Sequence, residues 1–443
     1  MKRVTTLVFV SMLLLVLAAC AGNNDGGAAP VDNQPAQNQP AQGNQAAPAD
    51  TSANVSQGIT DTTVRVGNAA AVSGPFAAIG GPFNDGMRAY FHQINESGGI
   101  HGRTIEFVHH DDGFDPVSGL AFTEQLIFDD RIFAIVGHFG TPTIGATLDL
   151  LAETGIPAVY FASGISALFN DAAHTVADGR NLFPVQPIFI TEGRVLVARA
   201  VEEYYVNRIG VIFTSDDAGH DFIRGISDQT SALGIDVVQE QIAPGQADVS
   251  SAVLRMLTED VDAVIVATLQ ATLPAVINAI VAAGLDVPIF TSYISADSAT
   301  LAGFTADYLG VGASFPIYAT AWLDIGIAPD FVPEHAEFVA GVTAFGDPDL
   351  AASAFAMAGW IAGSTFAQGF ANTDPANLTW EAFMDAMEST PINLPMGGVM
   401  DFSNGARTGT DAMALVRANM ETVAWETIRP IEPLHAVIAR VER

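Results

Sequence analysis

The segment from Ile132 to Phe161, IFAIVGHFGTPTIGATLDLLAETGIPAVYF, decides the fold of this chain. Its opening, Ile132 to Gly137, is a short and continuous apolar run, which is typical of a strand buried on both faces. An amphipathic pattern over Thr143 to Thr154 predicts a helix, and Ala158 to Phe161 predicts a second strand. A strand, a helix and a strand in close succession indicate a βαβ unit with parallel strands.

The same alternation extends to both sides of this segment. After an irregular stretch, Phe169 to Pro187, it begins again and continues to Thr291. We therefore predict an α/β protein with two doubly wound, Rossmann-like lobes, whose ligand lies at the carboxyl ends of the strands. The further predicted strands are Thr63–Ala70, Thr104–His110, Arg208–Thr214, Asp236–Gln241, Ala263–Thr268 and Pro288–Thr291. The further predicted helices are Gly81–Ser97, Val117–Asp129, Ile190–Tyr205, Asp221–Leu233, Val249–Thr258 and Leu273–Ala283.

The amino terminus has the pattern of an export signal. A basic pair, Lys2-Arg3, precedes the apolar run Leu7 to Leu17, which is too short to span a bilayer. The following Leu17-Ala18-Ala19-Cys20 resembles the lipobox of bacterial lipoproteins, which implies a signal peptide over 1–19 and a lipid on Cys20. The alternative is an ordinary secreted protein with an incidental cysteine. Residues 20–57 are small and polar, so we expect a disordered linker behind the lipid.

Composition excludes several classes of partner. The 443 residues contain 17 basic and 49 acidic side chains, with a formal net charge of −32, so nucleic acid is excluded as a partner. We interpret the scarcity of basic residues as a signature of solubility or of habitat, such as saline or acidic surroundings, and not as a binding patch. Cys20 is the only cysteine, so disulfides are excluded. No later apolar run is long enough to predict a second membrane segment.

An ordered set of motifs runs along the chain: Val72-Ser73-Gly74-Pro75, Ile94 to Arg103, Asp111 to Pro116, Val136 to Thr143, Asp216 to Asp221 and Gly398 to Gly405. This ordered set is similar to the Leu/Ile/Val-binding family of ABC-transporter solute receptors. The resemblance covers Thr62 to Arg443 and implies a type I periplasmic binding protein, in which three hinge strands join the lobes. It places residues 58–186 and 319–397 in the N-terminal lobe, and 187–318 and 398–443 in the C-terminal lobe.

Two loops of the first half suit a carboxylate. We expect Thr141 to be the N-cap of a helix with Pro142 at its first position, which leaves free N–H groups for an anion. The resemblance places Thr141 where the family holds the ligand carboxylate, and it adds Gly140 and the loop Ala162-Ser163-Gly164. The alternative for both loops is ordinary helix capping.

The opposite lobe departs from the amino-acid receptors. Ile294 stands where they place an acid for the ligand ammonium, and Leu269-Gln270 replaces their aromatic wall. A buried ammonium without a counter-charge costs several kcal/mol, so an α-amino acid is doubtful unless Asp217 or Asp297 supplies the charge. We expect a branched-chain amino acid-like, aromatic or other carboxylate, or an amide. Apolar contacts are expected from Ile79, Phe139 and Tyr293, which are alternatively core residues.

Enzymatic chemistry has little support. The sequence lacks a Gly-x-Ser-x-Gly elbow, and a lipidated Cys20 excludes a thiol nucleophile. Adjacent His109 and His110 point to opposite faces of a strand, so a metal site is not expected, and neither is a cofactor. We therefore expect a monomeric, lipid-anchored, extracytoplasmic receptor that passes a small solute to an ABC permease. The alternatives are a sensor for a separate membrane kinase and an extracytoplasmic hydrolase.

Overall fold

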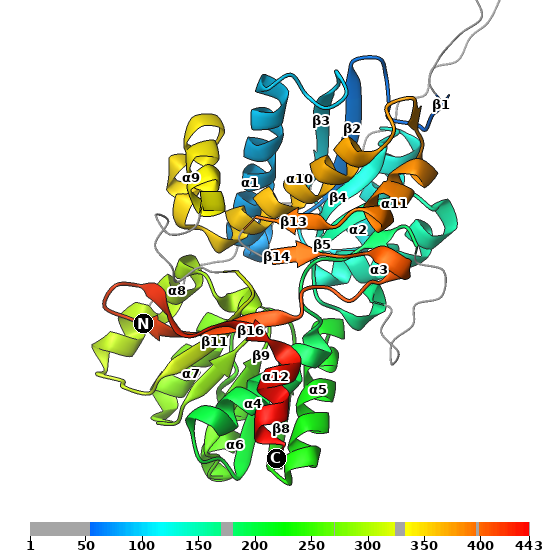
Figure 1. The fold of residues 1–443 in the computed structure, drawn as a ribbon. Coiled ribbons are helices and arrows are strands. Elements are labelled where there is room, and N and C mark those ends of the chain that lie inside the picture. The colour runs from blue at the N-terminus through cyan, green and yellow to red at the C-terminus, as the bar shows by residue number, and fades with distance from the viewer. Residues whose placement is uncertain (1–53, 170–179, 270, 324–332, 396–397, 443) are drawn as a thin grey trace, which may run out of the picture. The chain divides into compact units, whose positions relative to one another are not determined.

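Two sheets of largely parallel strands organise the chain (Figure 1). The structure is a computed structural model that describes residues 54–442 apart from 170–179, 270, 324–332 and 396–397. We call the five-stranded sheet with its helices the first lobe and the seven-stranded sheet with its helices the second lobe. Both belong to one compact unit, Ser52–Arg443.

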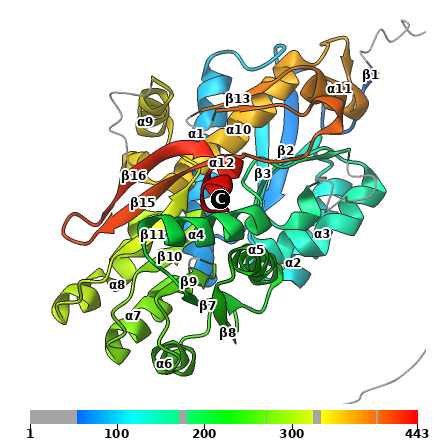
Figure 2. The same cartoon turned by 60° about the horizontal axis from the view of Figure 1, so that its bottom comes forward.

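The first lobe has five parallel strands in the order β3, β2, β4, β5 and β6. Helices α1 and α10 cover one face of this sheet, and α2 and α3 cover the other (Figure 2). The strands are β2 Thr63–Ala69, β3 Thr104–His110, β4 Ala134–Phe139, β5 Ala158–Ala162 and β6 Leu182–Phe183. The helices are α1 Ala77–Glu96, α2 Pro116–Phe128, α3 Thr141–Thr154, α9 Pro333–Phe345, α10 Ala354–Asn372 and α11 Trp380–Ser389. Two short pairs complete it, β1 Asn54–Val55 with β12 Asn377–Leu378 and β13 Ile392–Leu394 with β14 Gly398–Met400.

The second lobe has seven strands in the order β16, β15, β11, β10, β9, β7 and β8. The last two strands of the chain, β15 and β16, run antiparallel to their neighbours, and the others are parallel. The strands are β7 Arg208–Thr214, β8 Asp236–Ile242, β9 Ala263–Ala267, β10 Ile289–Thr291, β11 Ile317–Ala321, β15 Ala412–Asn419 and β16 Ala424–Pro433. The helices are α4 Phe189–Glu203, α5 Asp217–Leu233, α6 Ser250–Thr258, α7 Leu273–Ala283, α8 Ser298–Gly310 and α12 Leu434–Val441.

The predicted fold class is confirmed by these two α/β lobes. Strands β3 and β7 and helix α7 have the bounds expected from the sequence. The β15–β16 hairpin was not foreseen from the pattern of the sequence. The lobe boundaries stay a prediction. The predicted boundary between residues 318 and 319 falls within β11, which pairs with β15 of the second sheet through Ala321.

Glycines bring α1 and α10 into backbone contact. A Cβ atom on Gly86 would lie 2.1 Å from the carbonyl oxygen of Ala356, and one on Gly359 would lie 1.8 Å from that of Phe83. Any larger residue at either position would force the helices apart. The contact fixes the start of α10 relative to the first lobe.

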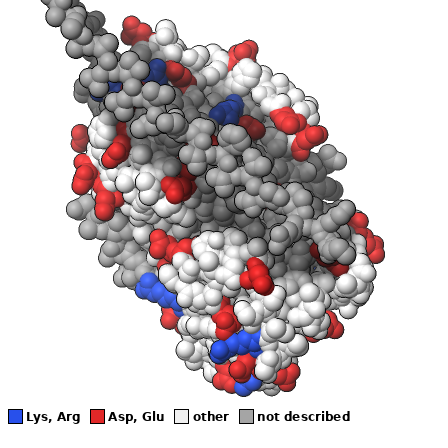
Figure 3. All heavy atoms as spheres, turned by 180° about the vertical axis from the view of Figure 1, so that it is seen from behind, with Lys and Arg blue, Asp and Glu red and all other residues white. Residues whose placement is uncertain are grey.

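The described surface is mainly acidic. Figure 3 shows a face on which Asp and Glu are widely scattered and the few Lys and Arg stand near them. Many of the arginines are paired, as in Arg440 with Glu202 and Glu432. Among the helices of the described residues, none combines the length and apolar character that a bilayer crossing requires.

A buried polar network lies inside the first lobe. Asn68 Nδ2 donates to Asn84 Oδ1 at 2.9 Å and to the Gly137 carbonyl at 2.7 Å. The Nδ1 atom of fully buried His138 accepts from the Ala69 N–H at 3.3 Å. Burial lowers the pKa of His138 to about 3, so this ring is neutral in the folded protein. His109 belongs to the same network, through Asn84, whereas the adjacent His110 bonds to Asp130.

We predict that His138 makes stability fall in acid. Its pKa is about 3 when folded and about 6.5 when unfolded, so unfolding takes up a proton between these values. The unfolding free energy should therefore decrease as pH falls below about 6.5. His138→Gln should reduce this slope by up to about 1.4 kcal/mol per pH unit, measured by urea unfolding at several pH values. His92→Gln, at an exposed position, is the control. Equal slopes for His138→Gln and the parent would contradict the prediction.

Candidate functional site

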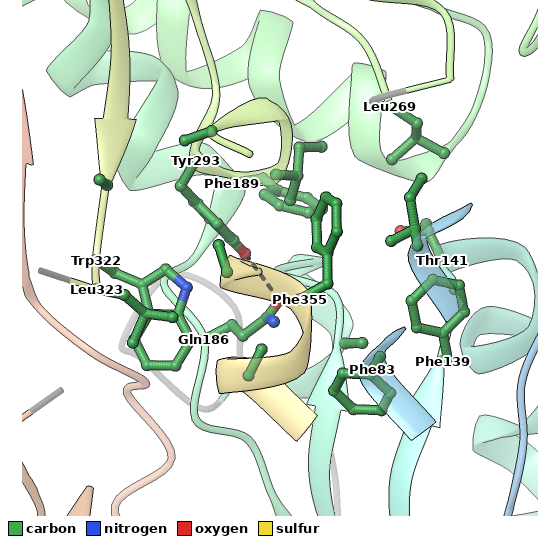
Figure 4. A pocket seen from close by; sticks show the side chains of 18 of the residues that line it. Phe83, Phe139, Thr141, Gln186, Phe189, Leu269, Tyr293, Trp322, Leu323 and Phe355 are labelled. Carbon is green, nitrogen blue, oxygen red and sulfur yellow. Dashed lines mark hydrogen bonds between the residues drawn. The ribbon is translucent and has the colours of Figure 1, made fainter. Parts of the chain in front are cut away.

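A cavity of about 70 Å³, measured as the space open to the centres of water molecules, lies where the two lobes meet (Figure 4). The first lobe contributes α1, the loops after β4 and β5, and the start of α10. The second lobe contributes the turn after β10 and the segment after β11. The cavity thus lies at the carboxyl ends of both sheets, as expected for doubly wound folds.

The lining is apolar and uncharged. Four lining side chains carry a polar atom, Thr141, Gln186, Tyr293 and Trp322, and the described lining includes no Asp, Glu, Lys or Arg. Such a wall suits an apolar body with a small number of fixed hydrogen bonds. The aromatic lining residues are Phe83, Phe114, Phe139, Phe189, Tyr293, Trp322 and Phe355, and the aliphatic ones include Ile79, Leu269, Ile294 and Leu323.

The N-terminus of α3 forms one end of the cavity. The expectation that Thr141 is the N-cap is wrong, because Gly140 takes that position with φ of 93°. A Cβ atom at Gly140 would lie 2.6 Å from the ring of Phe114, so glycine is needed both for conformation and for space. Thr141 is therefore the first helical residue, and its hydroxyl is hydrogen-bonded to Ser163 Oγ at 2.8 Å.

The loop after β5 supports this end of the cavity from behind. Ala162 lines the cavity, whereas Ser163 is buried beneath Thr141. Gly164 lies against the chain that crosses to the second lobe, since a Cβ atom there would be 2.2 Å from the Pro187 carbonyl oxygen. The predicted Ala-Ser-Gly loop is thus placed at the cavity, with one of its residues facing it.

A chain of hydrogen bonds forms the opposite wall. The Tyr293 hydroxyl donates to Gln186 Oε1 at 3.1 Å (Figure 4). Gln186 Nε2 in turn donates to the Tyr160 hydroxyl at 2.9 Å. Burial raises the pKa of Tyr293 well above its usual value, so the phenol is neutral. Gln186 therefore joins a strand of the first lobe to the turn that carries Tyr293 in the second.

The remaining predicted residues are distributed as follows. Ile79, Phe139, Gly140, Thr141, Ala162, Tyr293 and Ile294 line the cavity, and Asp217 begins α5 without being part of the lining. Gln270 lies outside the described residues. Within the described residues, no group of His, Cys, Asp and Glu side chains is placed to hold a metal.

Asp297 holds two helices rather than facing the cavity. Its Oδ1 accepts from the Ala299 N–H of α8 at 2.8 Å, and its Oδ2 accepts from the Ala354 N–H of α10 at 3.0 Å. Burial raises the pKa of Asp297, and these backbone hydrogen bonds lower it. Since both oxygens are occupied by helix N-termini, Asp297 is not a free counter-charge for a ligand ammonium.

Sequence reasoning missed several lining residues. Gln186 falls in the stretch described as irregular, and Trp322 and Leu323 follow a strand that was not predicted. Phe355 belongs to α10, a helix that lies beyond the last helix predicted from the sequence pattern. A signal was available for Trp322, because side chains directly after a parallel strand lie at the ligand edge of the sheet.

A family model described as periplasmic binding protein matches residues 63–422. The chain belongs to the periplasmic binding protein family. This periplasmic binding protein is 25% identical to the Leu/Ile/Val-binding protein of Citrobacter freundii over 201 residues, 45% of this chain and 53% of the relative. It is 24% identical to the leucine-specific-binding protein of Salmonella typhimurium over 47% of this chain and 55% of the relative. The matched part therefore spans about half the length of these relatives.

Solved structures confirm the type I fold. A fatty acid ABC transporter substrate-binding protein from Thermomonospora curvata has a TM-score of 0.73 at 18% identity, over 86% of this chain and 95% of its own. A Thermus thermophilus branched chain amino acid ABC transporter protein with bound valine has a TM-score of 0.72 at 14% identity, over 86% and 99%. An R. palustris solute binding protein in complex with benzoate has a TM-score of 0.68 at 20% identity, over 84% and 98%.

We predict that Asp297 stabilises the junction of α8 and α10. Asp297→Ala removes the hydrogen bonds that the carboxylate accepts from Ala299 and from the start of α10, and it should lower the unfolding free energy by about 1–3 kcal/mol, measured by urea unfolding. Asp297→Asn should lose less, because the amide oxygen can still accept from one helix start. The control is Asp248→Ala, which removes an exposed acid that accepts from the Ser250 N–H. Equal losses at positions 297 and 248 would contradict the prediction.

Proposed function

We propose that this periplasmic binding protein is the extracytoplasmic solute receptor of an ABC importer. It binds a small organic solute between its lobes and presents it to the permease. The observation that carries the proposal is the uncharged, largely apolar cavity to which both lobes contribute. Solute contacts with both walls favour one arrangement of the lobes, which is how such a receptor signals that it is loaded.

The solute is proposed to be an apolar or aromatic carboxylate. Its carboxylate would meet Thr141 and the start of α3, where a hydroxyl and the helix dipole favour an anion. Its apolar body would pack among Phe83, Phe139 and Phe355. The structural neighbours whose titles name fatty acid and benzoate support this class.

An α-amino acid fits this cavity less well. Ile294 lines the wall where the amino-acid receptors are expected to place an acid, and Asp297 is committed to two helices. An ammonium placed here would contact no acidic side chain among the described lining residues, and a buried ammonium that lacks such a contact costs several kcal/mol. The neighbour with bound valine supports the fold but not this ligand for the present chain.

The receptor is proposed to be a monomer tethered by a lipid on Cys20. The basic pair, the short apolar run and the small residues before Cys20 support export and lipidation. The residues that follow have the polar composition of a spacer between the membrane and the first lobe, and Cys20 itself lies outside the described residues.

We predict that deaminated acids bind at least as tightly as the matching amino acids. The test is calorimetry of 3-phenylpropanoate beside phenylalanine, and of 4-methylpentanoate beside leucine. Thr141→Val should weaken binding of the acids about tenfold to a hundredfold, because a hydrogen bond to a charged group is lost. Thr154→Val changes a hydroxyl on the same helix that bonds to Leu150, and it should leave the affinity unchanged. A strong preference for the amino acids would reject the proposed ligand class.

We predict that Cys20→Ser releases the protein from the membrane without unfolding it. The lipid attaches to the thiol, and a serine hydroxyl does not replace it. Detergent-phase partitioning of the two forms from cell extracts is the measurement, with urea unfolding as the control for folding. Membrane association that persists in the variant would reject the lipid anchor.

A further inference from the structure

Glu192 is a buried acid directly behind the second-lobe wall of the cavity. It lies in the first turn of α4, and its side chain is fully buried. Its Oε2 accepts from Ser292 Oγ at 2.9 Å, and its Oε1 accepts from the Tyr293 N–H at 2.9 Å. Oε1 also accepts from the Thr320 hydroxyl. One carboxylate is thus held by three donors.

These donors belong to the two segments that form the wall. Ser292 and Tyr293 begin the turn after β10, which brings Tyr293 and Ile294 to the cavity. Thr320 lies in β11, immediately before the lining residues Ala321, Trp322 and Leu323. The turn after β10 and the end of β11 are therefore fastened to each other through Glu192.

The charge of Glu192 has no cation beside it among the described residues. Burial raises its pKa to about 7, while the hydrogen bonds from Thr320, Tyr293 and Ser292 lower it. The titratable group that faces it is the Tyr293 phenol, which interacts electrostatically with it. Charged groups of the neighbouring elements are engaged elsewhere: Arg194 with Gln229 and Glu442, Arg199 with Glu202 and Glu432, and Asp221 with Ser166.

We infer that Glu192 is a positioning residue for the cavity, and that its carboxylate form fixes the Tyr293 turn against the end of β11 whereas its protonation loosens that link. The inference rests on the proposed function only in taking this cavity as the solute site. Adding a proton removes the charge that strengthens the three hydrogen bonds. The hydroxyls of Ser292 and Thr320 can rotate to accept instead of donate, but the Tyr293 N–H cannot.

The first test needs no solute. Hydrogen exchange of the Tyr293 amide is measured in the parent and in Glu192→Gln at about pH 6 and about pH 8, on either side of the expected titration. At the higher pH the parent should be about threefold to tenfold more protected than the variant, and this ratio should approach one at the lower pH. Glu153→Gln, an exposed position on α3, is the control and should match the parent at both pH values.

A second variant keeps the inference testable if Glu192→Gln folds poorly. Thr320→Val removes a donor that stabilises the charged form, so the pH at which Tyr293 loses protection should move upward. An unchanged midpoint in Thr320→Val, or equal pH profiles in the parent and Glu192→Gln, would overturn the inference.

The second test uses 3-phenylpropanoate, which stays ionised over this pH range. Its affinity for the parent should fall about threefold to tenfold from the higher to the lower pH, and the affinity of Glu192→Gln should stay at the low-pH value. If this acid binds with the same pH dependence in both proteins, the inference is overturned. If it does not bind at all, the proposed ligand class fails, and the amide exchange still decides the role of Glu192.

Discussion

Scarcity of positive charge is the constraint on which much of this structure depends. With 17 basic against 49 acidic residues, the protein cannot give each acid a cation. Buried and half-buried carboxylates are held instead by hydroxyl and backbone N–H groups: Asp112 by Thr143 and Phe114, half-buried Asp216 by Thr214 and Gly219, Glu192 by Ser292, Tyr293 and Thr320, and Asp297 by Ala299 and Ala354. Burial raises the pKa of each of these acids, because no full positive charge offsets the loss of solvation.

The same constraint shapes the cavity. An anion that enters it meets a threonine hydroxyl and a helix N-terminus rather than an arginine. Neutral donors attract an anion less strongly than a guanidinium does, so the apolar surface must supply a large part of the affinity. The seven aromatic side chains that line the cavity provide such an apolar surface, while the neutral donors at the α3 end bind the anion only weakly.

The sequence was sufficient for the fold class because the strands and helices predicted up to Thr291 carry their own local patterns, although β11 and the β15–β16 hairpin were not predicted. The continuous apolar run before Gly140 predicts β4, and the amphipathic stretch after it predicts α3. The site was less accessible, because its wall combines segments that are distant in the chain. Trp322 and Phe355 come from separate elements whose convergence no local pattern encodes. The structural roles of Glu192 and Asp297 could not be predicted either, because a sequence does not show which backbone N–H groups will donate to a given carboxylate.

The backbone contact between α1 and α10 has a consequence for movement between the lobes. Because Gly86 and Gly359 leave no gap between these helices, α10 should move with α1 and the first lobe as one rigid body. Asp297 then connects the two lobes, since one of its carboxylate oxygens accepts from α8 of the second lobe and the other accepts from the start of α10 in the first. Separation of the lobes would exchange the hydrogen bonds that Asp297 accepts from the start of α10 for hydrogen bonds with water, and such an exchange has a small net free energy. The Asp297 junction therefore adds little to the free-energy difference between the joined and separated arrangements of the lobes. The binding energy of a small solute is enough to determine which arrangement is populated.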